Sequence, residues 1–331
     1  MDFLIYIPCH SDIENAFKQG NVIRSQVKEW NNSEGNKVNL KLVLSINSYP
    51  ATDDEILTAN KIFDEVRDFR DVFLADVNIS QGFLVALLEK PKYFWLLSTN
   101  DFIQPKAIGL ILDKLTENSD LDILATNGSG LEGKFTESEV LNPPRSQMSY
   151  GLISSVIYNV DTMGKFFNYA PFFSWTGWSQ LAVLQGALRG EGTLQVVTIP
   201  HYLVYSQNER PIQESGRVYA HSFFGMLILG SIFEITTSEK RKYIRRFIRG
   251  NFYNIHLYSR KNQSRKIISS SNYLFWNQRI AEAIIKKNVP VTYLVYCVLR
   301  GISFHRFESI PALKRLKNSF DEKLRKESFL E

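Results

Sequence analysis

The stretch Tyr93-Phe94-Trp95-Leu96-Leu97-Ser98-Thr99-Asn100-Asp101 changes abruptly from an aromatic and apolar run to small polar residues. A continuous apolar run is typical of a buried strand in a parallel sheet, and ligands of open α/β sheets bind where such strands end. We therefore expect the active site at Asn100 and Asp101. The alternative is an ordinary polar turn, in which Asp101 caps a helix that begins near Pro105.

Strand-like and helix-like segments alternate along residues 1–205. Short apolar runs rich in β-forming residues predict strands, and apolar residues with helical spacing follow most of them. This alternation predicts an α/β fold with a mostly parallel, doubly wound sheet and helices on both faces. The expected strands are residues 3–7, 40–46, 72–74, 93–97, 121–125, 152–158 and 194–199.

Two of the expected helices have clear local start signals. Thr52 or Asp53, within an acidic cluster, predicts a capped helix through Ile62. The polar and small residues between 78 and 82 are expected to precede a helix that starts at Phe83.

Charge divides the chain into two parts. Residues 1–235 carry 18 Lys and Arg against 27 Asp and Glu, a net charge of −9, whereas residues 236–331 carry 21 against 7, a net charge of +14. We therefore expect an α/β domain at 1–235 and a basic helical region at 236–331 with different partners. Between Lys240 and Tyr253, basic and aromatic residues interleave with the spacing of an amphipathic helix.

The basic region has three interpretations. It is a solvated helical cap, a contact with an anionic membrane surface, or a nucleic-acid surface. No nucleic-acid motif is recognised there, so charge is the whole case for RNA or DNA. The aromatic residues from Tyr243 to Tyr258 suit contact with another subunit, in a homo-oligomer, as well as contact with lipid.

Cysteine usage and hydropathy indicate the compartment. Cys9 and Cys297 are far apart and lack the spacing of a metal site or a disulfide framework. The first residues lack the pattern of a signal peptide, and no stretch reaches the roughly 20 apolar residues of a spanning helix. We expect a cytoplasmic protein.

Several of these features occur together in one family. Ile5-Tyr6-Ile7-Pro8 before a polar loop, a strand that ends near Asn47, Asn78 four residues before Gly82, and Trp95–Asp101 resemble the family 2 glycosyltransferases with the GT-A fold. The resemblance covers about residues 3–205 and is nearest to the bacterial surface-polysaccharide branch, which includes abequosyltransferase-like proteins.

The resemblance implies a GT-A (Rossmann-like) fold and transfer of one sugar from a nucleotide-sugar donor. The acceptor would be a lipid-linked oligosaccharide in O-antigen (lipopolysaccharide) or capsule synthesis, and the basic region would hold the protein to the anionic inner face of the cytoplasmic membrane.

The resemblance also implies roles for individual residues. Asn100 and Asp101 would lie at the donor diphosphate and its divalent cation, Mn²⁺ or Mg²⁺, which neutralises the leaving group. Relatives have two or three aspartates where this sequence has one. A weak or shared metal site, a metal-independent enzyme and a non-catalytic binding or assembly protein therefore all stay open. The implied nucleotide-binding residues are Pro8, His10, Ser11, Asn47, Asp53, Asn78, Gly82, Thr99 and Asn100.

The family's catalytic base is expected near residues 175–180, where this sequence has no carboxylate. Inverting transfer needs a base within hydrogen-bond reach of the acceptor hydroxyl. Trp175, Trp178 and Gln180 are expected at the acceptor sugar, because flat aromatic faces suit the C–H surfaces of sugars; core packing is the alternative for either tryptophan. The candidate catalytic residues are Asp101, Asp161, His201, Glu214 and His221.

Overall fold

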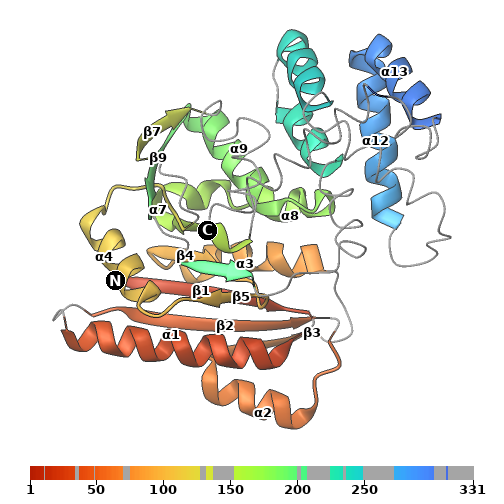
Figure 1. Cartoon of the computed structure of the whole chain (residues 1–331). Coiled ribbons are helices and arrows are strands. Elements are labelled where there is room, and N and C mark those ends of the chain that lie inside the picture. The colour runs from red at the N-terminus through yellow and green to blue at the C-terminus, as the bar shows by residue number, and fades with distance from the viewer. Residues whose placement is uncertain are drawn as a thin grey trace. The chain divides into compact units, whose positions relative to one another are not determined.

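The computed structural model describes most of the first 206 residues and three helical stretches beyond them (Figure 1). The chain divides into two compact units, Met1–Glu209 and Arg210–Glu331. The charge pattern changes later, at residue 236. The described residues are 1–10, 12–33, 37–47, 49–69, 75–126, 132–136, 153–199, 203–206, 224–233, 236–248, 272–301 and 311.

The first unit contains an eight-stranded sheet with the order β3-β2-β1-β4-β8-β6-β9-β7. Strands β3, β2, β1 and β4 are parallel, as are β6 and β9, whereas β8 and β7 run antiparallel to their neighbours. The predicted mostly parallel sheet is confirmed. A second, two-stranded sheet joins β5 to β10. The strands are β1 Asp2–Cys9, β2 Asn39–Asn47, β3 Glu65–Phe69, β4 Tyr93–Leu96, β5 Asp101–Ile103, β6 Ile123–Ala125, β7 Gly133–Thr136, β8 Val156–Asn159, β9 Thr193–Thr198 and β10 Val204–Ser206.

Helices cover both faces of the large sheet, as predicted (Figure 1). Residues of α1, α2 and α4 form one core with Trp95 and Leu97. On the other face, Phe83 of α3 makes edge contacts with Phe94 and Phe167. The helices of this unit are α1 Ile13–Ser33, α2 Asp53–Ile62, α3 Ala75–Glu89, α4 Ala107–Glu117, α7 Val160–Met163, α8 Tyr169–Phe172 and α9 Ser179–Glu191.

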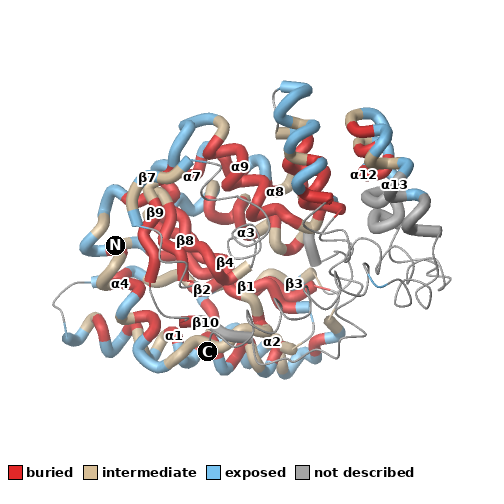
Figure 2. The backbone as a smooth tube through the Cα atoms, turned by 45° about the horizontal axis from the view of Figure 1, so that its top comes forward, coloured by how far each residue is buried: buried red, intermediate tan, exposed pale blue. Residues whose placement is uncertain are grey.

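The central strands β1 and β4 are buried on both faces (Figure 2). All four residues of β4 are completely buried, which explains why this segment lacks polar alternation. Tyr6 pairs with Leu96, and the Leu97 N–H donates to the Tyr6 carbonyl at 3.0 Å. The polar residues after Leu97 therefore begin where β4 leaves the sheet.

The capping prediction for α2 is confirmed in detail. Thr52 is the N-cap: its side chain accepts from the Glu55 N–H at 3.2 Å, and the Glu55 carboxylate accepts from the Thr52 N–H at 2.7 Å. Asp53 is the first helical residue, as the local acidic pattern indicated.

Two expected boundaries differ from the structure, and one expected strand lies outside the described residues. Residues 72–74, expected as the third strand, lie outside the described residues, and the third described strand is β3. Helix α3 begins at Ala75 and contains residues 78–82, because the Asn78 and Ser80 side chains find hydrogen-bond partners inside the protein. Residues 153–155 form a 3-10 turn, η1, so β8 starts at Val156.

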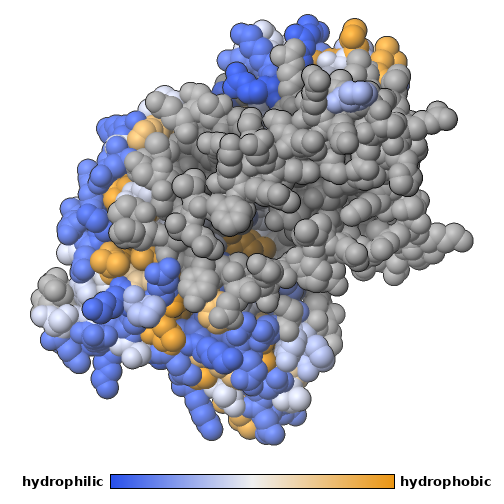
Figure 3. Space-filling model, viewed as in Figure 1, coloured by the Kyte–Doolittle hydropathy of each residue, from blue (hydrophilic) through white to orange (hydrophobic). Residues whose placement is uncertain are grey.

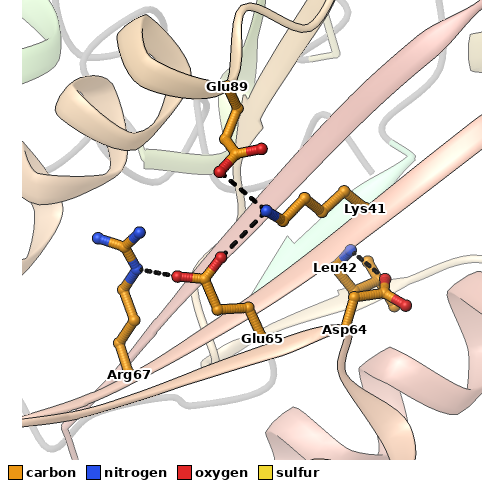
Figure 4. Close-up of polar contacts among 6 residues, drawn as sticks. All are labelled: Lys41, Leu42, Asp64, Glu65, Arg67 and Glu89. Atoms are coloured by element: carbon orange, nitrogen blue, oxygen red, sulfur yellow. Dashed lines mark hydrogen bonds and ion pairs between the residues drawn. The ribbon is translucent and has the colours of Figure 1, made fainter.

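A group of ion pairs ties the edge strand β3 to β2 and α3 at the amino end of the strands (Figure 4). Lys41 Nζ lies 3.1 Å from Glu65 Oε2 and 2.9 Å from Glu89 Oε1, and Arg67 Nε lies 2.6 Å from Glu65 Oε1. Burial alone would raise the pKa of Glu65, but its Lys41 and Arg67 partners lower it overall. These contacts stabilise the amino ends of β2 and β3, at the opposite end of the strands from Asp101.

The second unit contains helices at residues 224–233 and 237–248, and helices α12, Asn272–Asn288, and α13, Pro290–Gly301. The Tyr243 hydroxyl donates to the Met226 carbonyl at 2.8 Å, and a Cβ added at Gly230 would meet the Tyr243 ring. Ile244 and Phe247 are also buried. The apolar side of the predicted basic amphipathic helix is therefore occupied within its own unit.

The described helices include none that combines the length and the apolar character needed to cross a membrane.

Candidate functional site

The strand order places three strand ends along one edge of the sheet. β2 and β4 lie on opposite sides of β1 and run parallel to it, so the order of connection reverses at β1. Open α/β sheets bind ligands at such a switch point, outside the carboxyl ends of the strands. The segments that follow Cys9, Asn47 and Leu96 meet at this edge.

The turn after β4 is held by a closely spaced set of hydrogen bonds. The Asp101 N–H donates to the Ser98 carbonyl at 3.2 Å, and the Asn100 N–H donates to the Ser98 hydroxyl at 3.2 Å. The Ser98 N–H donates to the Ser154 hydroxyl at 2.9 Å. Thr99 is completely buried, and its hydroxyl has no partner among the described residues. These hydrogen bonds connect the turn to Ser154 and lead the chain into β5 at Asp101.

Asp101 is half-buried and hydrogen-bonded through its carboxylate. The Ser154 hydroxyl donates to Asp101 Oδ2 at 2.5 Å. Burial raises the pKa of the Asp101 carboxyl above its usual value, and the Ser154 hydrogen bond opposes that rise. The alternative role as a helix cap is wrong, because Lys106 is the N-cap of α4 and Asp101 lies in β5.

Gln19 of α1 is a site residue that sequence reasoning missed. Its Nε2 donates to the Ser98 carbonyl at 2.8 Å and also to the Asp101 carbonyl. Gln19 is 3% exposed, and its Oε1 has no partner among the described residues. An unpartnered buried amide oxygen costs roughly 1–3 kcal/mol. No local signal marks this residue, because its partners lie 79 and 82 positions along the chain.

Asn78 and Asn47 form a buried polar pair between α3 and β2. Asn78 Nδ2 donates to Asn47 Oδ1 and to the Ser45 carbonyl, both at 3.0 Å, and Asn78 Oδ1 accepts from the Tyr6 hydroxyl at 2.9 Å. The Asn78 amide is thus engaged inside the protein. Asn78 was expected to bind the nucleotide directly. In this arrangement it would instead act indirectly, by positioning Asn47 at the carboxyl end of β2.

The other residues expected at the nucleotide have varied surroundings. Pro8 is buried inside β1, His10 follows β1 and is exposed, and Asp53 is exposed at the start of α2. A Cβ at Gly82 would lie 2.9 Å from Leu96 Cδ2 and 2.9 Å from Tyr6 Cδ1, so close packing of α3 on the sheet explains this glycine. Ser11 lies outside the described residues. Nucleotide contact by these residues stays a prediction.

The two tryptophans expected at the acceptor differ in exposure. Trp178 is 8% exposed and Gln180 is also buried, as core packing predicts. Trp175 is 36% exposed, with its Nε1–H donating to the Phe172 carbonyl at 3.1 Å. Gly177 separates the tryptophans with φ of 76°, a left-handed conformation that favours glycine. Trp175 is the tryptophan whose ring is accessible to a sugar.

The structure places Asp161, one of the predicted catalytic residues, far from Asp101 along the strands. β8 runs antiparallel to β4, with Asn159 opposite Tyr93, and the Val160 N–H donates to the Lys92 carbonyl at 2.9 Å. The carboxyl end of β8 therefore lies beside the amino end of β4, so Asp161 is at the sheet edge opposite Asp101. The other candidate bases, His201, Glu214 and His221, lie outside the described residues.

The donor set for a divalent cation is small. Among the residues that the structure describes, no three His, Cys, Asp or Glu side chains gather into a metal site. Asp101 supplies one carboxylate, of which one oxygen accepts from Ser154, and the neighbouring Asn100 adds an amide. Mg²⁺ is commonly bound by one or two carboxylates together with substrate phosphates. These residues fit a cation shared with a bound diphosphate.

The fold has solved counterparts at low sequence identity. It is similar to two crystal structures of S. aureus TarS residues 1–349, one of them in complex with UDP-GlcNAc. That complex has a TM-score of 0.50 at 12% identity, covering 87% of this chain and 82% of that chain. The second has a TM-score of 0.50 at 12% identity, covering 88% and 82%. The chain has a GT-A-like fold.

A third comparison is weaker. The mannosyltransferase PcManGT from Pyrobaculum calidifontis, in complex with GDP-Man and Mn²⁺, aligns with a TM-score of 0.42 at 7% identity, covering 90% of this chain and 85% of that chain. No protein-family model matches the sequence, and no curated protein matches it. The GT-A-like fold therefore rests on the sheet and its helices, and the roles of single residues are argued from their geometry.

Proposed function

We propose that this protein is a glycosyltransferase that moves one sugar from a nucleotide-sugar donor to a glycan acceptor. The supporting observation is the fixed position of Asp101 at the switch-point edge of a GT-A-like sheet, in a turn held by Ser98, Gln19 and Ser154. TarS, which shares the fold, was crystallised with UDP-GlcNAc.

The charges at this edge support a division of the donor between two places. Asp12 caps α1 by accepting from the Asn15 N–H at 3.0 Å, and Glu14 lies in the first turn. These carboxylates occupy the helix end at which dinucleotide-binding folds bind phosphate. We therefore assign the nucleoside to the ends of β1 and β2, near His10 and Asn47, and the diphosphate to the turn with Asp101.

The leaving diphosphate carries concentrated negative charge. A divalent cation held by Asp101 and Asn100 together with the donor phosphates would neutralise that charge. The chain's own part is to hold the Asp101 carboxylate half-buried in one orientation, so that no reorganisation is needed when the glycosidic bond breaks.

The acceptor proposal rests on Trp175. Its accessible ring offers a flat face to an acceptor sugar, and a lipid-linked oligosaccharide of surface-polysaccharide synthesis, as in the abequosyltransferase-like branch, is the acceptor that the sequence resemblance favours. We assign the general base to one of His201, Glu214 and His221. Replacing each histidine with alanine, and Glu214 with glutamine, and measuring single-turnover transfer distinguishes them, because loss of the base lowers kcat and leaves donor binding intact.

We also propose that the second unit binds an anionic membrane surface through charge. Arg241, Lys242 and Arg245 are exposed on the helix 237–248, while its apolar side is buried. Figure 3 shows both hydrophilic and hydrophobic side chains on the described part of the second unit. Clustered basic residues on a helix attract anionic lipid by about 1 kcal/mol each. This contact would keep the protein at the cytoplasmic face of the inner membrane.

A donor screen tests the proposed activity. Thermal unfolding is measured with UDP, GDP, CDP and dTDP sugars, each with and without Mn²⁺. Because a ligand at 100 times its Kd stabilises the folded state by about 2.7 kcal/mol, a matching donor raises Tm by several degrees. Release of the nucleoside diphosphate from that donor then measures turnover.

The same screen decides against a non-catalytic binding protein. That alternative is favoured by the single carboxylate at the site, and it predicts a nucleotide-dependent rise in Tm with no release of nucleoside diphosphate on any acceptor. No rise in Tm with any of the four nucleotides would overturn both functions.

A further inference from the structure

We propose that Gln19 and Ser154 are positioning residues that hold Asp101 in the orientation required by the donor diphosphate. This inference rests on the proposed glycosyltransferase function. It adds two residues from distant parts of the chain to the site.

Gln19 holds the backbone of the turn from the side of α1. Gln19 Nε2 donates to the carbonyl oxygens of Ser98 and Asp101, the first and last residues of the turn, and so bridges its two ends. The Gln19 side chain is buried, so this bridge is largely shielded from water. The Asp101 backbone is thereby attached to α1, the helix that follows β1.

Ser154 holds the side chain of Asp101 from the opposite direction. Its hydroxyl accepts from the Ser98 N–H and donates to Asp101 Oδ2, so one group sets both the turn and the carboxylate. The Ser154 carbonyl accepts from Trp95 Nε1 and Thr126 Oγ1, both at 2.9 Å. Ser154 is itself buried and doubly anchored, which makes it a rigid support.

Two features favour a positioning role over simple packing. The Oε1 atom of Gln19 is buried without a partner in the described residues, which an apolar side chain of similar size would avoid. In addition, the Ser154 hydroxyl does two things at once. Its oxygen accepts from the Ser98 N–H, and its proton is donated to the Asp101 carboxylate. Both residues direct their polar atoms at the segment that carries Asp101.

The experiment compares Gln19→Leu and Ser154→Ala with matched controls. Gln26→Leu is the control for Gln19→Leu. Gln26 also lies on α1, where its side chain donates a hydrogen bond to the Gln104 carbonyl and accepts one from the Ile108 N–H. Ser231→Ala removes a buried hydroxyl bonded to the Ile228 carbonyl in the second unit. Ser154→Thr restores the hydroxyl.

Each variant is measured for unfolding temperature alone, for the rise in Tm with the best nucleoside diphosphate and Mn²⁺, and for donor turnover. We expect Gln19→Leu and Ser154→Ala to lower kcat/KM by roughly 10- to 100-fold and to reduce the nucleotide-dependent rise in Tm. Ser154→Thr should recover part of the turnover lost in Ser154→Ala. Gln26→Leu and Ser231→Ala should lower Tm without changing either functional measure.

The outcomes separate this inference from the function on which it rests. Wild-type kcat/KM in folded Ser154→Ala or Gln19→Leu, with strong loss in Asp101→Asn, would overturn the positioning role and leave the glycosyltransferase intact. Equal loss in the Gln26→Leu control would also overturn it, because general destabilisation would then explain the effect. An unaffected rate in Asp101→Asn would overturn both. If Gln19→Leu does not fold, Ser154→Ala and Ser154→Thr decide.

Discussion

At the scale of single residues, Asp101 carries a charge that the fold disfavours. Burial raises the pKa of its carboxyl above the unfolded value of about 3.9. At a pH between these two pKa values, the folded protein keeps a proton on Asp101 that the unfolded chain has released. The stability that this group contributes is therefore present below pH 4 and is lost as the pH rises through the folded pKa.

The Asp101→Asn variant tests this balance of stability and function. We expect turnover to fall by about 100-fold or more, because an amide carries no charge. At pH 7 the Tm should stay unchanged or rise, because the amide removes the cost of a half-buried charge. Thermal unfolding at a series of pH values from 4 upward should show the gain growing as the pH rises through the folded pKa of the wild-type carboxyl. A Tm that falls at pH 7 would contradict the raised pKa.

Gly82 gives a second prediction at this scale. Gly82→Ala should destabilise the protein by about 1–3 kcal/mol, because the new methyl group meets Leu96 and Tyr6 at 2.9 Å in a packed core. Gly109→Ala in α4 is the control: its nearest contact is Trp30 Cδ1 at 3.8 Å, so it should be neutral or stabilise by up to about 1 kcal/mol. Urea unfolding measures both. Equal effects of the two changes would exclude the packing role of Gly82.

At the scale of elements, local signals explain where α2 begins. Thr52→Ala removes the acceptor for the Glu55 N–H and should cost about 1 kcal/mol. Thr58→Ala on the same helix removes only a hydroxyl bonded to the Asp54 carbonyl, and should be neutral or slightly stabilising. Denaturant midpoints of the two variants check the difference. A neutral Thr52→Ala would show that tertiary packing alone fixes this helix end.

Some elements were predictable from sequence, and others were not. β4 was correctly placed, because its residues are buried on both faces and the run is uniformly apolar. The start of α3 was misplaced, because Asn78 resembles a loop residue until Tyr6 and Asn47 satisfy its amide. Local polarity indicated a loop where tertiary hydrogen bonds allow a helix.

At the scale of the whole molecule, charge separates residues 236–331, at +14, from residues 1–235, at −9. We expect the protein to bind anionic vesicles, with affinity that falls as salt rises. Replacing Arg241, Lys242 and Arg245 together with glutamate should weaken binding at least 10-fold in cosedimentation.

The control for that experiment makes the same change of charge in the first unit. Lys18, Lys28 and Lys61 are exposed there, and their replacement with glutamate should leave vesicle binding nearly unchanged. Equal loss in both triple variants would show that net charge acts without a particular surface. Unchanged binding by the Arg241 triple variant would remove helix 237–248 from the membrane contact.

The sequence by itself determined the buried strands β1, β2, β4, β6 and β9, the cap of α2, the position of the turn at Asp101 and the division of charge. Each of these depends on residue type and spacing over a few neighbours, which local patterns report. Only the tertiary structure decided which residues meet Asp101. Gln19 and Ser154 reach it because β1, β4 and β8 lie side by side, and Asp161 is at the other edge because β8 runs antiparallel. Strand order and direction arise from long-range packing, which no local pattern encodes.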